Sequence, residues 1–113
     1  MQIVPGNQFL LTNTVGFSLL CCRLSPFLKS RESARRVKKE IDELVKRIGA
    51  DMVEVDFGKV EFSTGCFMDE FYNLFLSSEA REQGCATVEV VNVPEDIEVI
   101  LAAVVRSNTV RSN

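Results

Sequence analysis

The clearest pattern in the chain is a change from strand-like alternation to helical spacing between residues 52 and 75. Apolar residues first alternate with Glu54 and Asp56, which predicts a strand over 51–57 with one buried face. Later apolar residues fall at i, i+4, i+7 and i+8, which predicts a helix over 67–78. The residues concerned are Val53, Val55 and Phe57 in the strand, and Phe67, Phe71, Leu74 and Phe75 in the helix. Between them, Val60 and Phe62 are expected to point back at the core. The junction of strand and helix is the expected functional edge.

The same two periods predict the remaining elements. Ser30 as N-cap and Gly49 as stop predict a helix over 31–48. A strand is expected over 86–91, and a last helix from Pro94 to about Arg106, since proline is tolerated in a first helical turn. The N-terminal residues are typical of short strands and turns, over 2–4, 8–12 and 15–22.

This order predicts one α/β domain over 1–113. Helices that alternate with strands favour a mainly parallel small sheet, flanked by about three helices, with the N-terminal strands of 1–27 at one edge. The tail over 107–113 is polar and expected to fray. The last helix is apolar on nearly all sides, which favours a place in the core over a dimer contact, although both remain open. The residues that make it so are Val99, Ala102, Ala103 and Val105.

Composition removes several function classes. The chain has 113 residues and no histidine, so the commonest general base and metal ligand is missing and an enzyme is not expected. Its four cysteines form no C-x-x-C pair, so neither zinc nor another metal or cofactor is predicted. Buried, reduced thiols are favoured, with adjacent Cys21 and Cys22 on opposite faces of a strand. A net charge of −3 and a pI near 5.0 argue against a nucleic-acid partner.

The sequence also favours a cytoplasmic location. Its longest apolar run, over 15–22, is far shorter than the roughly 20 residues that span a bilayer, so no membrane span is expected. No positive charge precedes an apolar region at the N-terminus, so no signal peptide is expected.

The residues before the second predicted helix are candidates for a site. Ser63, Thr64 and Gly65 stand where helix N–H groups can hold an anion or a phosphoryl group, although an ordinary N-cap is the favoured reading. Asp69 and Glu70 are expected in the first turn, as dipole-stabilising acids or as an acidic contact patch. Cys66 is the only candidate nucleophile, and without a histidine base a buried, inert thiol is favoured.

These residues carry a resemblance to the STAS-like domain family, the relatives of bacterial anti-sigma factor antagonists. Residues 53–62, VEVDFGKVEF, resemble the family strand V-x-x-D-F-x-x-V-x-F, and 66–71, CFMDEF, resemble the helix start S-F-x-D-E-L of a STAS-like subgroup of unknown function. Residues 30–34 are similar to the first helix of that subgroup, and 91–93 to the approach to its last helix. The resemblance covers about 28–106.

The resemblance implies a STAS-like βα superhelix without a cofactor. It also implies a regulatory protein-interaction module whose partner is a histidine-kinase-like ATPase that phosphorylates the start of the second helix. Aligned without a gap, Gly65 falls at the acceptor position, and Thr64 and Ser63 just before it become the candidate phosphoacceptors. The implied partner-binding residues are Ser63, Thr64, Gly65, Asp69, Glu70 and Asn73. The alternative is a small homodimeric structural protein, or a ligand- or anion-binding one.

Overall fold

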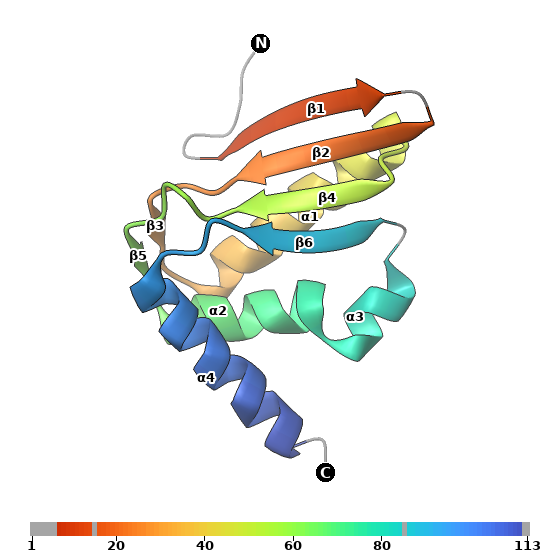
Figure 1. The fold of residues 1–113 in the computed structure, drawn as a ribbon. Helices are drawn as coiled ribbons and strands as arrows, with labels where there is room; N and C mark the ends of the chain where they lie inside the picture. The colour runs from red at the N-terminus through yellow and green to blue at the C-terminus, as the bar shows by residue number, and fades with distance from the viewer. Residues whose placement is uncertain (1–6, 15, 85, 112–113) are drawn as a thin grey trace.

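A computed structural model of the chain describes residues 7–14, 16–84 and 86–111, the side chains of 13, 14 and 109–111 excepted (Figure 1). The strand predicted over 2–4 lies outside the described residues. No helix of the described chain is both long enough and apolar enough to cross a membrane.

Four strands form one mixed sheet in the order β1-β2-β4-β6. The antiparallel pair β1 and β2 lies at one edge, and β2, β4 and β6 run parallel to one another. An α/β fold with the N-terminal strands at one edge is therefore confirmed. The strands are β1 (Gln8–Thr14), β2 (Phe17–Arg23), β4 (Met52–Asp56) and β6 (Thr87–Val91).

Two further strands form a small parallel sheet of their own. β3 (Phe27–Leu28) follows β2, and β5 (Phe62–Ser63) follows β4. The peptide N–H groups of Glu61 and Phe62 both donate to the carbonyl of Pro26, which holds the two segments together. This pair lies at the end of the molecule where α2 begins (Figure 1).

The helices cover one face of the main sheet. In Figure 1, α1 crosses behind the sheet and α2 and α3 lie beneath β6. α1 packs against α2, and α2 packs against α4. The helical segments are α1 (Arg31–Ile48), α2 (Gly65–Phe71), the π-helical turn η1 (Tyr72–Leu76), α3 (Ser78–Gln83) and α4 (Glu95–Arg111).

The core lies between the sheet and these helices. The strand alternation places Leu20, Cys22, Val53 and Val55 inward, where each is at most 2% exposed. The Phe71 ring is fully buried among aromatic neighbours, with centroids 5.4 Å from Phe57 and 4.8 Å from Phe75. Burying one such side chain contributes about 1.5–3 kcal/mol. The helical half of the 52–75 pattern is thus committed to the core, as predicted.

The first helix has the predicted bounds because both of its ends are built locally. The hydroxyl of Ser30 accepts a hydrogen bond from the N–H of Ser33 at 3.1 Å. Gly49 adopts the left-handed conformation at φ 68°, and its N–H donates to the carbonyl of Val45. The bounds of β1, β2, β4 and β6 also fall within two residues of the strands predicted over 8–12, 15–22, 51–57 and 86–91.

The bounds predicted for the second helix, 67–78, are wrong at both ends. It begins at Gly65, because the hydroxyl of Thr64 caps it two residues earlier than expected. Asp69 and Glu70 therefore lie in its second turn, not its first. At the other end the chain widens into η1, and Ser77 then caps a separate helix, α3, that the apolar pattern does not predict.

The prediction for the last helix is also corrected. α4 packs inward with Ile97, which is 2% exposed, but its opposite side faces solvent, with Val99 66% exposed and Ala102 and Ala103 exposed too. The helix also continues to Arg111, beyond the predicted end, and part of the polar tail is thus helical. Within this added length, the amide of Asn108 donates to the carbonyl of Val104 at 2.8 Å.

The described cysteines differ in solvent exposure according to their positions on the strand and the helix. Cys22 is buried and Cys21 is half-exposed, so the predicted opposite faces are confirmed. Burial, with the nearby charge of Glu40, raises the pKa of Cys22 to about 12 and keeps it protonated. Cys66 is exposed, contrary to prediction, because it lies in the first turn of α2 beside inward-facing Phe67. The side chain of Cys85 lies outside the described residues.

Candidate functional site

The loop between β4 and α2 is anchored by a buried carboxylate, Asp56. It accepts hydrogen bonds from the N–H of Gly58 at 2.7 Å, from the amide of Asn92 at 3.2 Å and from the guanidinium of Arg23 at 3.4 Å. Burial raises its pKa, but the three donors outweigh burial and leave the pKa below the usual value. Asp56 thus ties the ends of β2, β4 and β6 together and fixes where the chain turns towards α2.

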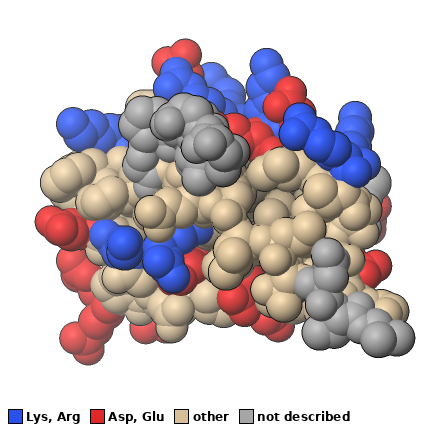
Figure 2. All heavy atoms as spheres, turned by 90° about the horizontal axis from the view of Figure 1, so that it is seen from above, with Lys and Arg blue, Asp and Glu red and all other residues tan. Residues whose placement is uncertain are grey.

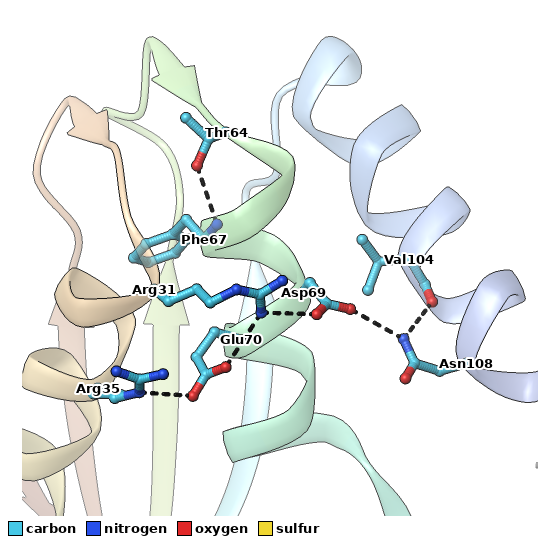
Figure 3. A network of polar contacts seen from close by, with 8 residues as sticks. All are labelled: Arg31, Arg35, Thr64, Phe67, Asp69, Glu70, Val104 and Asn108. Atoms are coloured by element: carbon cyan, nitrogen blue, oxygen red, sulfur yellow. Dashed lines mark hydrogen bonds and ion pairs between the residues drawn. The ribbon is translucent and has the colours of Figure 1, made fainter. Parts of the chain in front are cut away.

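Thr64 holds the start of α2 with both functions of its hydroxyl. The oxygen accepts from the N–H of Phe67 at 3.0 Å (Figure 3). The hydroxyl donates to the carbonyl of Lys29 at 3.1 Å. The favoured N-cap reading is confirmed for Thr64. Its side chain is half-buried. Thr64 therefore couples the helix start to the segment that follows β3.

The neighbours of Thr64 differ from each other in access. Ser63 is only 6% exposed, and its hydroxyl donates to the carbonyl of Thr64 at 3.2 Å. Gly65 is exposed, and a Cβ added there would meet nothing within 4 Å. Of the two candidate phosphoacceptors, Thr64 is the more accessible, and the aligned position Gly65 has room for a side chain.

Asp69 and Glu70 on α2 point towards side chains of the neighbouring helices α1 and α4 (Figure 3). Arg31 donates to Asp69 at 2.9 Å and to Glu70 at 3.3 Å, and Arg35 donates to Glu70 at 3.0 Å. The amide of Asn108 lies 3.5 Å from the other oxygen of Asp69. The side chains of Asp69 and Glu70 are 26% and 16% exposed. These carboxylates join α2 to α1 and α4.

The ion pairs act on the guanidinium as expected. The hydrogen bond to Asp69 is the largest of the effects that raise the pKa of Arg31, and the charge of Asp69 adds to it. The acids therefore favour the charged form of Arg31. Both acids are predicted partner-binding residues, and the structure gives them a second role within the fold.

Asn73 lies apart from the other predicted residues. It is nine positions beyond Thr64 in α2 and η1, a rise of about 13 Å along a helix. Its side chain is exposed and its carbonyl accepts from the hydroxyl of Ser77, which starts α3. The structure thus brings Ser63, Thr64 and Gly65 together, but leaves Asn73 at the far end of the segment.

Two exposed aromatic residues that the apolar pattern does not mark as a site lie beside Thr64. Phe27 and Phe62 are direct partners across β3 and β5, with exposed fractions of 56% and 49%. The Lys29 ammonium lies 6.0 Å from the centroid of the Phe27 ring. The alternation of Val60 with Phe62 predicts that both point inward, and this is wrong for Phe62, because its strand pairs with β3 outside the main sheet. An aromatic residue directly after Pro26 is the one local signal.

The site offers little to a metal ion. Among the described residues, no three Cys, Asp or Glu side chains lie together in a way that could hold one. Comparison of the chain with models of known protein families found no match. Comparison with curated proteins found none either.

Proposed function

We propose that this chain is a non-enzymatic regulatory module of the STAS-like kind, which binds a protein partner through the surface around Thr64. This aromatic surface consists of Phe27, Phe62, Thr64 and Gly65. The observation that carries the proposal is the pairing of two half-exposed phenylalanines directly beside the helix start that the family resemblance singles out. Adjacent exposed aromatics of this kind are enriched where proteins bind one another.

The surroundings of the two rings suit a protein partner. Lys29, two residues after Phe27, and Glu61, directly before Phe62, are both exposed, so charged side chains adjoin the apolar pair as they do in the polar rim of an interface. The sequence contains no histidine, and this supports a binding role over an enzymatic one. The βα superhelix of the STAS family remains part of the proposal, on the strength of the quoted motifs.

A phospho-switch at Thr64 would act through the hydrogen bonds of its hydroxyl. Phosphorylation replaces the proton that the Thr64 oxygen donates to the carbonyl of Lys29, so this contact between α2 and the segment after β3 would be lost. Roughly two negative charges would arrive next to the aromatic surface. A kinase-like ATPase is the partner class that the resemblance implies.

Affinity capture from native cells, followed by mass spectrometry, tests the aromatic surface. Replacing Phe27→Ser together with Phe62→Ser should remove the specific partner while the protein stays folded by circular dichroism. The matched control is Phe17→Ser, an aromatic residue of comparable exposure, 43%, on β2. Unchanged capture by the double variant would refute this surface.

The switch has its own test. Thr64→Glu should reduce capture at least as much as neutral Thr64→Gln, which removes the same hydroxyl without adding charge. If both variants capture the partner as the wild type does, the phospho-switch is excluded and the binding surface is not.

A cavity of about 660 Å³ supports the alternative, a ligand-binding role. It lies between α1 and α3, with an apolar floor that includes Val53 and Phe75 and with Lys38, Lys46 and Arg81 at its walls. Cavities of this size take small molecules. The lining also includes Asp42, which pairs with Lys38 at 3.3 Å, and Glu79, so Lys46 and Arg81 are the cations to which an apolar carboxylate would bind. Thermal shift measurements with aromatic and fatty carboxylates test it, and Lys46→Ala should reduce any shift.

A further inference from the structure

The outer edge of the main sheet is a long strand without charge. β1 pairs with β2 in continuous register from Gln8 to Thr14 and has no strand on its other side among the described residues. Its sequence, QFLLTNT, contains no Lys, Arg, Asp, Glu or Pro. Every second residue of an edge strand turns its N–H and C=O away from its neighbour. Such an edge is a template for pairing with another strand.

Apolar side chains accompany these backbone groups. Leu10 is 66% exposed and Leu11 is 39% exposed, and adjacent strand residues point to opposite faces of the sheet. The opposite edge is built differently, because β6 has five residues and carries exposed Glu89. Figure 2 looks down onto the β1 side, where uncharged residues occupy much of the described middle, Lys and Arg gather along one rim, and a second group of basic and acidic residues lies to one side. An uncharged centre with a charged rim is typical of a protein interface.

We propose that β1 pairs antiparallel with β1 of a second copy of this chain, which joins two sheets into one of eight strands. A two-fold register that sets Leu11 opposite Leu11 places Leu10 opposite Thr12 of the other copy. No position of this register opposes two like charges, because the strand has none. An identical uncharged strand is therefore a complementary partner, and a two-fold dimer leaves no further edge of this kind open.

The rows across the joined sheet favour the same partner. Cys21 lies beside Leu10, and Leu19 lies beside Thr12. On the open face, the proposed register therefore makes a continuous row of Cys21, Leu10, then Thr12 and Leu19 of the other copy. The nearest acid in that row, Glu54, is one strand further from the joint. The interface does not include the aromatic surface, so it stands or falls independently of the proposed function.

Sedimentation velocity over a wide concentration range tests the proposal on the full chain. The wild type should approach a mass of twice 12.7 kDa as concentration rises. Leu11→Lys should weaken the dimer at least tenfold, because two ammonium groups would meet at the two-fold axis. The control Thr87→Lys adds the same charge at an exposed position of β6, on the opposite edge, and should leave the dimer unchanged. Leu10→Lys, at a more exposed position, should also weaken the dimer. This second variant tests the proposal even if Leu11→Lys fails to fold.

A charge-swap mixture gives the sharpest result. Leu11→Lys and Leu11→Glu should each be monomeric alone and should form a dimer when mixed, because opposite charges then meet at the axis. A wild type that remains monomeric throughout would overturn the proposal. A dimer that survives both Leu11 variants, or one that Val99→Lys on α4 abolishes instead, would also overturn it.

Discussion

Two groups of side chains lie close to the start of α2, and they are used in opposite ways. Asp69 and Glu70 carry the charges that a sequence motif marks as partner contacts, yet the side chains are only 26% and 16% exposed and are paired with Arg31 and Arg35. Phe27 and Phe62 look like core residues, yet each is about half exposed. Residue type alone would therefore predict exposed acids and buried phenylalanines, and the structure shows the phenylalanines to be the more exposed of the two groups.

The difference follows from where each group finds its neighbours. The two arginines lie on α1, 38 and 35 positions away from their acids in the sequence, and only the packing of α1 against α2 brings them together. The two phenylalanines lie on short strands that pair with each other instead of joining the main sheet. A polar side chain becomes less exposed when it pairs with a partner, and an apolar side chain stays exposed when no other element packs against its strand.

The largest expected effect lies in the core beneath these groups. Phe71→Ala should lower the free energy of unfolding by about 3–5 kcal/mol, because it truncates a fully buried ring among three others. Urea denaturation measures it, with Phe17→Ala as an exposed control. A loss below about 1 kcal/mol would show that this face of α2 is not packed as described.

Charge reversal at the acids distinguishes the two roles directly. Asp69→Lys with Glu70→Lys should lower the melting temperature by several degrees, because two new cations would face Arg31 and Arg35. The matched pair Glu79→Lys and Glu82→Lys, on exposed positions of α3, should have little effect. If the first pair melts like the wild type but no longer captures a partner, these acids belong to the binding surface and the contrast with the phenylalanines fails.

The cap between the two groups has a smaller effect. Thr64→Ala should lower the free energy of unfolding by about 1 kcal/mol, since it removes the acceptor for the N–H of Phe67. Thr64→Ser should retain most of the stability. Paired denaturation curves measure both, and equal losses for the two variants would argue that the methyl group, not the hydroxyl, holds the helix start.

Asp56 predicts a dependence on pH. Its pKa in the folded protein lies below the ordinary value of 3.8, despite the opposing effect of burial, because three donors stabilise the carboxylate. The stabilisation is therefore complete above that ordinary value and is lost as the pH falls through it and towards the lower, folded pKa. Unfolding free energies measured across this acid range should fall more steeply for the wild type than for Asp56→Asn. Parallel curves would contradict the assignment.

The smallest expected effect on stability belongs to the aromatic surface. Phe27→Ser with Phe62→Ser should change the free energy of unfolding by no more than about 0.5 kcal/mol per residue, as is usual for exposed positions. Thermal melting by circular dichroism measures it. A loss comparable to that of Phe71→Ala would mean that the two rings belong to the core, and the contrast with Asp69 and Glu70 would disappear.

The parts of the molecule that could be predicted depend on neighbours in the sequence. The α1 bounds follow from Ser30 and Gly49, which act on backbone groups within four residues. The inward faces of β4 and α2 follow from alternation and helical spacing. Apolar spacing places the start of α2 two residues late, because that spacing begins at Phe67, whereas Thr64 supplies the cap.

The sequence by itself determined the order of strands and helices, the apolar faces that form the core and the caps at which α1 begins and ends. Only the tertiary structure decided that Asp69 and Glu70 are paired and that Phe27 and Phe62 remain exposed. The physical reason is range. Caps and amphipathic faces depend on groups a few residues apart, whereas exposure depends on what packing brings from dozens of residues away.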